Sequence, residues 1–530
     1  MPATEPVAEP AAPGRPFRES LLAMLGISSV LMLSALDQTV IGNALPSIVA
    51  DLGGFELYAW VATGYLLASI VAIPIFGRLG DFHGRKPFVL LAATVFTLAS
   101  LLCAVAPGIA WLVAGRTLQG VGGGILIGTA FACVPELFPD TRQRLRWQML
   151  LSAAFSVVNA AGPTLGGVLT ETFGWRSVFW LNLPVGALSL FMVWRYLPRF
   201  RPAPRAHAAL DWPGALLVTV ALGALQLCVE FLPRIGDGRL GTALGLLSAA
   251  AFGGLWWWER RAQAPLLPRE LFRDDRLRRL FALSVLAGAV MFMLLFYMPP
   301  LLQGVYGYSP KDAGLLITPL VLCITLGAIV NGRVVTRMRN PKRLPQGGFV
   351  LLLLASVGLV AVGRNAGFGL LLGLMLCAGL GLGFILMNLT LFTQVLAPRE
   401  HLGIATALVQ SLRLVGAMLG TALAGALVDA LYRHGVAEGF AARGAGSLAP
   451  LFTDPRVLFD GAMLRVAMGA VEAAGGQGGL LTELARGALA SAVGAAMGMA
   501  AVLAVVALWQ LRGLGLVELQ TGPALVAADD

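Results

Sequence analysis

Charged residues are scarce in this sequence. They make up 12% of the 530 residues, against roughly 25% in a typical soluble domain, while 57% are hydrophobic and the mean hydropathy is +0.79. This composition excludes a soluble globular protein. The alternation over about 10 residues that marks a membrane β-barrel is also missing. Apolar stretches of about 20 residues instead fit helices that cross roughly 30 Å of hydrocarbon, so we expect an all-α integral membrane protein.

Residues that carry catalytic or metal chemistry are equally sparse. The five cysteines lie inside apolar stretches without a CxxC pair, and the four histidines are scattered. A GxxxxGK[ST] loop is absent, which leaves ATP drive unsupported. We therefore expect no metal site and no cofactor, and an integral-membrane enzyme is a remote alternative. The net charge of +10 follows membrane topology, so no nucleic-acid partner is expected.

The distribution of basic residues predicts the topology. Alternate loops between apolar segments carry three to seven Lys or Arg each, and the opposite short loops carry two at most. The positive-inside rule then places the basic loops and both termini in the cytoplasm. The 14 predicted spans lie near 21–49, 57–76, 87–107, 110–134, 147–170, 178–197, 212–232, 240–258, 280–302, 314–336, 346–363, 366–393, 403–429 and 484–511.

A degraded internal repeat indicates two related halves. The segment GRLGDFHGRK at 77–86 follows the second span, and its echo GRVVTRMRNPK at 332–342 follows the tenth. Two halves around a central cavity form a transporter plan. The expected parts are a cytoplasmic tail (1–20), a six-helix half (21–200), two additional spans with a basic loop (201–279), a second six-helix half (280–511) and a cytoplasmic tail (512–530). The long outer loop at 430–483 is either a helical hairpin or disordered.

An acidic residue lies inside the first predicted span. Asp37 belongs to the segment LDQTVIGNALPSI, 36–48. A charge at a helix centre costs about 2.5–3.5 kcal/mol on insertion scales, and such groups usually mark ion or substrate pathways. The alternative is a protonated carboxyl that is hydrogen-bonded to a neighbouring helix.

A glycine-rich basic loop follows the second span. Gly77 and Gly84 allow a tight turn and close helix approach, and Asp81 is expected to pair with a cation or with a helix N-terminus across the interface between halves. Together with Arg85 and Lys86 it would form a cytoplasmic gate. The alternative is a loop that only sets topology.

Two more motifs lie in the fourth and fifth spans. Arg116 and Gln119 share a helical face, and a buried Arg needs an acidic partner unless it only bonds backbone carbonyls. The motif of the fifth span is expected to form a bendable gating helix, although plain packing through small residues would give the same pattern. Its gating residues are Gly162, Pro163, Gly166 and Gly167.

These patterns together resemble the major facilitator superfamily, specifically its 14-span drug:proton antiporter branch (EmrB/QacA-like). The resemblance implies two six-helix halves plus two central spans, in a bacterial plasma (inner) membrane. It further implies proton-driven export of hydrophobic or amphipathic small molecules without a cofactor, and it ties Arg116 to proton transfer. Arg413 in span 13 matches an Arg of branch members.

The expected partners are a small-molecule substrate, protons and the lipid bilayer. Two questions stay open from the sequence. One is whether the substrate is instead a single dedicated metabolite, such as an antibiotic or siderophore. The other is whether a periplasmic adaptor protein takes part.

The position of Asp37 leads to a hypothesis for coupling. We hypothesise that Asp37 carries the proton and that Arg116 or Arg413 favours its ionised form when the site faces the cytoplasm. A cationic substrate would compete for the same carboxylate.

The charge counts generate a topology prediction. A reporter fused after Arg343 should be cytoplasmic, and one fused near Gly446 should be outside. Reporter activity with the opposite pattern would contradict the 14-span arrangement.

Overall fold

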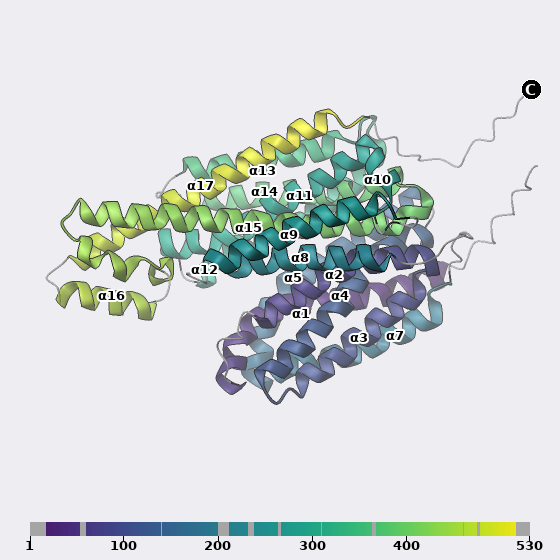
Figure 1. Cartoon of the computed structure of the whole chain (residues 1–530), viewed down its shortest axis with the longest axis horizontal. Helices are drawn as coiled ribbons and strands as arrows, with labels where there is room; N and C mark the ends of the chain where they lie inside the picture. Colours follow the sequence, from purple (N-terminus) through teal and green to yellow (C-terminus); the bar gives the residue numbers. More distant parts are fainter. Residues whose placement is uncertain are drawn as a thin grey trace, which may run out of the picture.

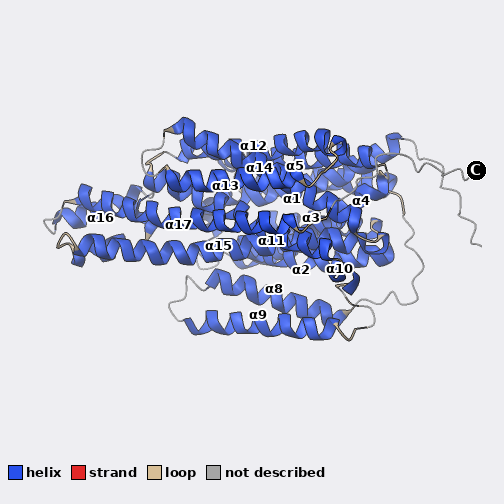
Figure 2. Ribbon diagram, turned by 90° about the horizontal axis from the view of Figure 1, so that it is seen from above, coloured by secondary structure: helices blue, strands red, loops and turns tan. Residues whose placement is uncertain are grey.

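The described part of the chain is helical. The computed structural model describes residues 17–52, 60–138, 140–199, 211–231, 238–262, 265, 267–308, 310–362, 367–458, 461–473 and 477–515. Within these ranges the regular structure consists of helices without strands (Figures 1 and 2). Twelve of the helices are long and apolar enough to cross a membrane. The prediction of an all-α, multi-span membrane protein is therefore confirmed.

The first seven helices form one group. Helix α1 packs against α5 and α7, and α4 packs against α2 and α3. Their apolar faces bury separate cores that include Leu31, Phe96 and Phe179. The helices are α1 (Phe17–Leu52), α2 (Trp60–His83), α3 (Lys86–Ala104), α4 (Ile109–Leu137), α5 (Thr141–Phe173), α6 (Arg176–Trp180) and α7 (Asn182–Tyr196).

A hairpin of two helices, α8 (Trp212–Phe231) and α9 (Gly238–Glu259), lies beside the bundle (Figure 2). Helix α8 contacts α2 and α15. Asp211 closes the hairpin, because its Oδ1 accepts hydrogen bonds from Gly214 N at 2.9 Å and from Trp258 Nε1 at 2.8 Å. Helix α8 coincides with a predicted span but has a shorter apolar segment than the twelve.

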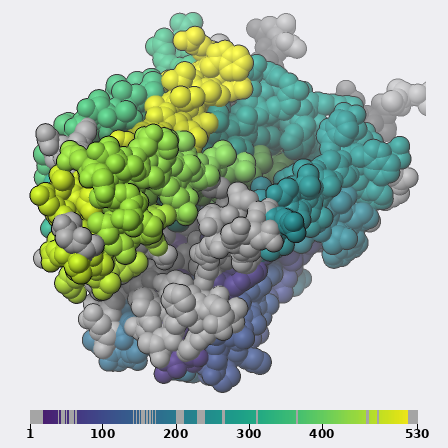
Figure 3. Space-filling view, turned by 60° about the vertical axis from the view of Figure 1, so that its left-hand side comes forward, coloured from purple at the N-terminus to yellow at the C-terminus, as the bar shows by residue number. Residues whose placement is uncertain are grey.

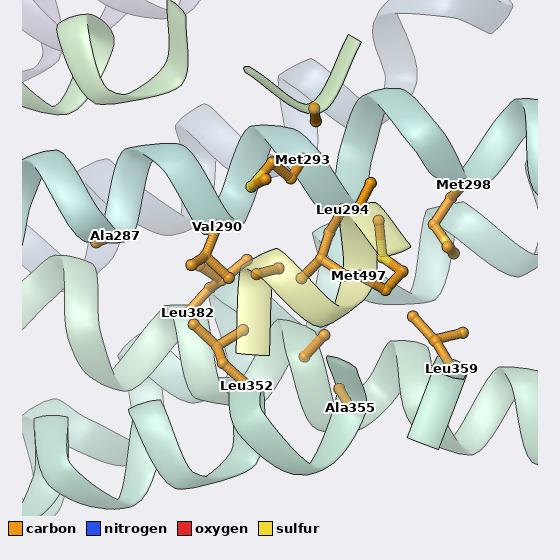
Figure 4. Packing of buried hydrophobic residues seen from close by; sticks show 14 of the residues in the cluster. Ala287, Val290, Met293, Leu294, Met298, Leu352, Ala355, Leu359, Leu382 and Met497 are labelled. Carbon is orange, nitrogen blue, oxygen red and sulfur yellow. The ribbon is translucent and has the colours of Figure 1, made fainter. Parts of the chain in front are cut away.

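The remaining helices form a second group with a continuous core. Figure 4 shows Met293 and Leu294 of α11, Leu352 of α13, Leu382 of α14 and Met497 of α17 packed together. The elements are α10 (Arg269–Arg273), α11 (Asp275–Pro300), the π-helical turn η2 (Leu301–Val305), α12 (Pro310–Val334), the 3-10 turn η3 (Val335–Arg337), α13 (Arg343–Ala361), α14 (Phe368–Leu396), η5 (Arg399–His401), α15 (Leu402–Ala441), η6 (Gly446–Phe452), η7 (Pro455–Leu458), α16 (Gly461–Ala473) and α17 (Gly478–Arg512).

Helices α15 and α17 extend past the bundle, and α16 lies near their extended ends (Figure 1). The buried side chains of this extension continue the core of the second group. Tyr432 donates a hydrogen bond to Phe452 O at 2.8 Å, and the rings of Phe440 and Phe452 lie 5.4 Å apart. The described residues of 430–483 are therefore folded and mainly helical.

The two groups converge at one end. We call the end at which α1 begins and α17 ends the terminal end. In Figure 1 the helices of the two groups approach each other there and diverge toward the opposite end. Figure 3 brings the end opposite the terminal end forward. It shows the second group in green and yellow, with the first group in purple and blue below. The groups meet through α2 and α4 against α15, and through α5 against α12.

Candidate functional site

Asp37 is the centre of a buried polar cluster in the first group. Its Oδ2 is ion-paired with Arg116 Nη1. Its Oδ1 accepts hydrogen bonds from Gln119 Nε2 at 3.0 Å and from Asn182 Nδ2 at 3.1 Å. All four side chains are buried. The cluster therefore joins α1, α4 and α7 inside the bundle.

A second set of bonds holds these donors in place. Ser100 Oγ accepts from Gln119 Nε2 at 2.7 Å and from Asn182 Nδ2 at 3.2 Å. Arg116 donates to Gln119 Oε1 at 2.7 Å and to Val61 O at 3.3 Å. The guanidinium also lies 4.5 Å from the centre of the Tyr65 ring. The Arg116 charge is thus surrounded by acceptors and a π face.

Both carboxyl oxygens of Asp37 act as acceptors in this cluster. Each contact of Asp37 comes from an N–H donor, and a carboxylate can accept at both oxygens. Removing one partner of a buried ion pair costs about 3–5 kcal/mol, because it leaves the other charge unpaired. A change at Asp37 must therefore be accompanied by rearrangement of its neighbours.

Asp81 connects the two groups at the terminal end. Its Oδ1 accepts from Gly403 N and its Oδ2 from Ile404 N, both at 2.8 Å. These amides lie in the first turn of α15, where N–H groups lack helical partners and the helix dipole is positive. Arg85 Nη2 donates to the same carboxylate at 3.1 Å. Asp81 thus contacts both a cation and a helix N-terminus.

The other residues of this loop have different positions. Arg85 donates to Ala132 O at 2.8 Å and is ion-paired with Glu136, so it is anchored to α4. Lys86 Nζ donates to Trp194 O at 2.7 Å, so this bond stays within the first group. This bond does not connect Lys86 to the second group of helices.

The two loop glycines meet separate geometric requirements. Gly84 has a φ of 80°, a conformation that L side chains rarely adopt, and it makes the turn between α2 and α3. A Cβ on Gly77 would lie 2.5 Å from Ala407 Cβ. Because glycine has no side chain, α2 can approach α15 closely at this position.

Further polar contacts close the same interface. Arg78 Nη1 lies 2.9 Å from His401 Nδ1. Gln148 Nε2 of α5 donates to Gln394 Oε1 of α14 at 2.6 Å. Sequence reasoning did not single out these residues, nor Asn182, Ser100, Tyr65 and Glu136. A signal existed for Asn182, because it is a polar residue at the start of an apolar stretch.

The motif of the fifth span lies within the uninterrupted helix α5. Gly162 is buried, and a Cβ on Gly166 would lie 2.9 Å from Val40 O of α1. Val40 follows Asp37 by three residues, so α5 approaches α1 closely next to the Asp37 cluster. Pro163 and Gly167 belong to the same helix, but their packing lies outside the described part.

Arg413 is not part of the Asp37 cluster. It lies in α15, and the ion pair of Asp37 is made by Arg116. In the described ranges, no group of three His, Cys, Asp or Glu has the arrangement of a metal site.

A helical bundle with a charged cluster sealed inside its apolar core has the construction of a multi-span membrane transporter. Residues 27–421 match the family model of the Major Facilitator Superfamily. The chain belongs to this superfamily. Its homologues and structural neighbours are transporters, so the enzyme alternative is set aside.

Two relatives and one solved structure illustrate the similarity. Multidrug resistance protein 3 of Bacillus subtilis (strain 168) is 33% identical over 315 residues, which cover 58% of this chain and 60% of that protein. The Tetracenomycin C resistance and export protein of Streptomyces glaucescens is 31% identical over 501 residues, or 93% of this chain and 90% of the relative. The human organic anion transporter MFSD10 (TETRAN) has the same fold, with a TM-score of 0.62 and 16% identity over 94% of this chain and 100% of that one.

The contacts of Asp81 generate the first structural prediction. Asp81→Ala removes the carboxylate that joins α2 to α15. Contacts with helix N-terminal amides contribute about 0.5–2 kcal/mol, so the equilibrium between closed and open terminal ends should shift roughly 2- to 30-fold. Transport should slow while protein level and membrane insertion stay near normal.

Asp429→Ala is the matched control, because Asp429 is paired with Arg433 on one exposed helix face. Transport assays in vesicles compare the two variants. Equal rates for Asp81→Ala and the parent would reduce this loop to a topology signal.

Asn182 generates a second prediction. Asn182→Leu removes one of the donors to Asp37, and a hydrogen bond to a charged group contributes about 1.5–3 kcal/mol. Both thermal stability and transport rate should fall. Ser189→Ala is the control on the same helix, since Ser189 Oγ bonds Gly26 O at 2.5 Å without touching Asp37. If both variants lose stability but neither loses transport, Asn182 has only a packing role.

Proposed function

We propose that this protein is a proton-coupled antiporter that exports hydrophobic or amphipathic small molecules by alternating access. The Asp37 cluster carries the proposal, because it offers a titratable group at the junction of three helices. The superfamily and the relatives named as multidrug resistance and export proteins support it. The scheme invokes neither a cofactor nor an adaptor protein.

We infer a chain with 14 spans in a bacterial plasma membrane, both termini being cytoplasmic. The twelve apolar helices, together with α5 and α8, coincide with the predicted spans and support this count. The basic loops support the orientation. On this view, 21–200 and 280–511 are the two halves, and the terminal end of the bundle faces the cytoplasm.

Protonation of Asp37 would change its surroundings directly. A protonated carboxyl carries an O–H donor, which cannot bond to the N–H donors of the cluster. It also no longer attracts the positive charge of Arg116. The proton therefore displaces at least one partner. Since the partners belong to α4 and α7, this displacement moves α1 relative to them, and Gly166 of α5 packs against the same part of α1.

The closed interface suggests an order of events. Asp37 is paired with Arg116 while Asp81 holds α2 and α15 together. With the cytoplasmic end closed, the proton that displaces Arg116 comes from outside. Breaking of the contact between Asp81 and α15 then exposes the site to the cytoplasm, where Arg116 pairs with Asp37 again and the proton is released inward. Substrate binding and proton release are linked because both depend on the same change between closed and open states.

A second candidate function is export of one dedicated metabolite. The Streptomyces glaucescens relative, named for tetracenomycin C resistance and export, matches 93% of this chain. Efflux of a panel of toxic compounds from strains that overexpress or lack the protein separates the two candidates. Protection against chemically unrelated compounds supports multidrug efflux, and protection against one scaffold supports dedicated export.

Asp37→Asn tests the coupling. The variant mimics the protonated carboxyl permanently, so it should lose uphill export and substrate-induced proton release. Proteoliposomes with an imposed pH gradient and a fluorescent substrate report both quantities. Asp51→Asn is the matched control on the same helix, because Asp51 lies at the far end of α1 and pairs with the exposed Arg176.

Asp37→Asn leaves Arg116 buried without a counter-charge, which destabilises the folded protein. The double variant Asp37→Asn/Arg116→Gln removes both charges and should recover thermal stability without recovering coupled export. If Asp37→Asn pumps like the parent, another residue carries the proton.

A further inference from the structure

Arg413 lies at mid-depth in the membrane bundle. It follows the start of α15 at Leu402 by 11 residues, which is about 16 Å along the helix axis. Roughly 30 Å of hydrocarbon places this position near the centre of the bilayer. Its neighbours on the same helical face, Gln410 and Ala417, are buried at 2% and 5% exposure. Arg413 therefore points into protein rather than into lipid.

The backbone at Arg413 is held tightly against α11. A Cβ on Gly288 of α11 would collide with Arg413 O, and a Cβ on Gly416 would collide with Val285 O. One turn later, Gly420 packs against Ala289. These contacts fix the point from which the Arg413 side chain projects, and a fixed origin reduces the cost of ordering a binding group.

The guanidinium of Arg413 has no partner in the described part of the chain. It makes no hydrogen bond, ion pair or ring contact there, whereas Arg116 and Arg85 each have several. The guanidinium stays charged under all ordinary conditions. An unpaired charge at this depth is costly and usually marks a substrate or ion pathway.

The local charge balance indicates the sign of the missing partner. Asp37, the acidic residue near the middle of a predicted span, is already paired with Arg116. Among the residues that the structure describes, Arg413 therefore adds a positive charge without a counter-charge to the interior. Gln410, three residues earlier on the same face, has a buried Oε1 that accepts no hydrogen bond from the described residues, so an acceptor for an N–H or O–H group lies near the cation.

We propose that Arg413 binds an anionic group of the exported molecule, a carboxylate or sulfonate on an amphipathic scaffold. This inference rests on the proposed export function and names its substrate class. Arg is suited to the task, because its planar fork donates two parallel hydrogen bonds to such groups. The anion neutralises Arg413, while the proton is carried separately at Asp37.

The assignment has an energetic consequence. Each cycle moves one negative charge outward with the anion and one positive charge inward with the proton. The membrane potential therefore acts on two charges per cycle, and the pH gradient also drives the exchange. A neutral molecule of the same shape gains only the contribution of the proton, and a cation opposes it. The export rate of anionic substrates should therefore increase more with applied membrane potential than the export rate of neutral or cationic substrates.

Two xanthene dyes of opposite charge provide the test. Fluorescein is anionic and rhodamine 123 is cationic on a closely similar scaffold. Fluorescence polarisation with the purified full-length protein measures the affinity of each dye. The parent should bind fluorescein more tightly, and Arg413→Gln should weaken fluorescein binding roughly tenfold or more, the scale of a charge-assisted hydrogen bond. Its rhodamine 123 affinity should stay the same or rise, because the variant no longer repels the cationic dye.

Two further variants separate binding from a structural role. Arg413→Lys keeps the charge but not the planar fork, so it should retain a preference for fluorescein that is smaller than the parent's. Arg433→Gln changes an exposed Arg of the same helix that is paired with Asp429, and it should leave both affinities unchanged. A purely structural Arg413 would weaken both dyes together and would not be rescued by Lys.

Several outcomes overturn the assignment. They are a parent that prefers rhodamine 123 or shows no preference, and an Arg413→Gln variant that keeps the parent's preference. Proton release is recorded in the same samples with a pH dye. Arg413-dependent fluorescein binding without proton release contradicts coupled antiport but leaves the anion site intact, so the two proposals fail separately.

Discussion

The ion pair between Asp37 and Arg116 is the interaction on which the rest of this structure depends. Two opposite charges are sealed inside an apolar bundle, where either one alone would be costly. Gln119, Asn182 and Ser100 complete the hydrogen bonds that make the pair tolerable. The same bonds connect α1, α4 and α7. A change in the charge of one carboxylate is therefore transmitted to three helices.

The second group of helices responds through α15. The first turn of this helix contacts Asp81 of α2, Arg413 follows 11 residues after the helix start, and the far end extends beyond the bundle. One helix thus connects the closing contact at the terminal end with the Arg413 guanidinium at mid-depth. In the proposed cycle, breaking of the Asp81 contact and occupation of Arg413 act on the same helix, which offers a direct physical link between gating and substrate binding.

The sequence predicted the fold well because apolar stretches of about 20 residues have few other solutions in water or lipid. It also predicted that Arg116 needs an acidic partner and that Asp81 meets a cation or a helix N-terminus, and the structure contains both contacts. Partners far apart in the chain escaped it. Asn182, Glu136 and the bond between Gln148 and Gln394 depend on how helices rotate and cross, which spacing along one helix does not specify. Likewise, sequence reasoning grouped Arg413 with Asp37, although only the packing of α15 decides where that side chain lies.

Infrared difference spectroscopy of the purified protein in lipid tests the central claim most directly, because the C=O stretch of a protonated carboxyl is resolved from that of a carboxylate. Samples are compared between neutral and acidic pH, with and without a transported substrate. The account predicts a protonated-carboxyl band that grows on acidification, shrinks when substrate binds and is missing in Asp37→Asn. A band with the same response to pH and substrate in Asp37→Asn would contradict the account, since the proton would then reside on another residue.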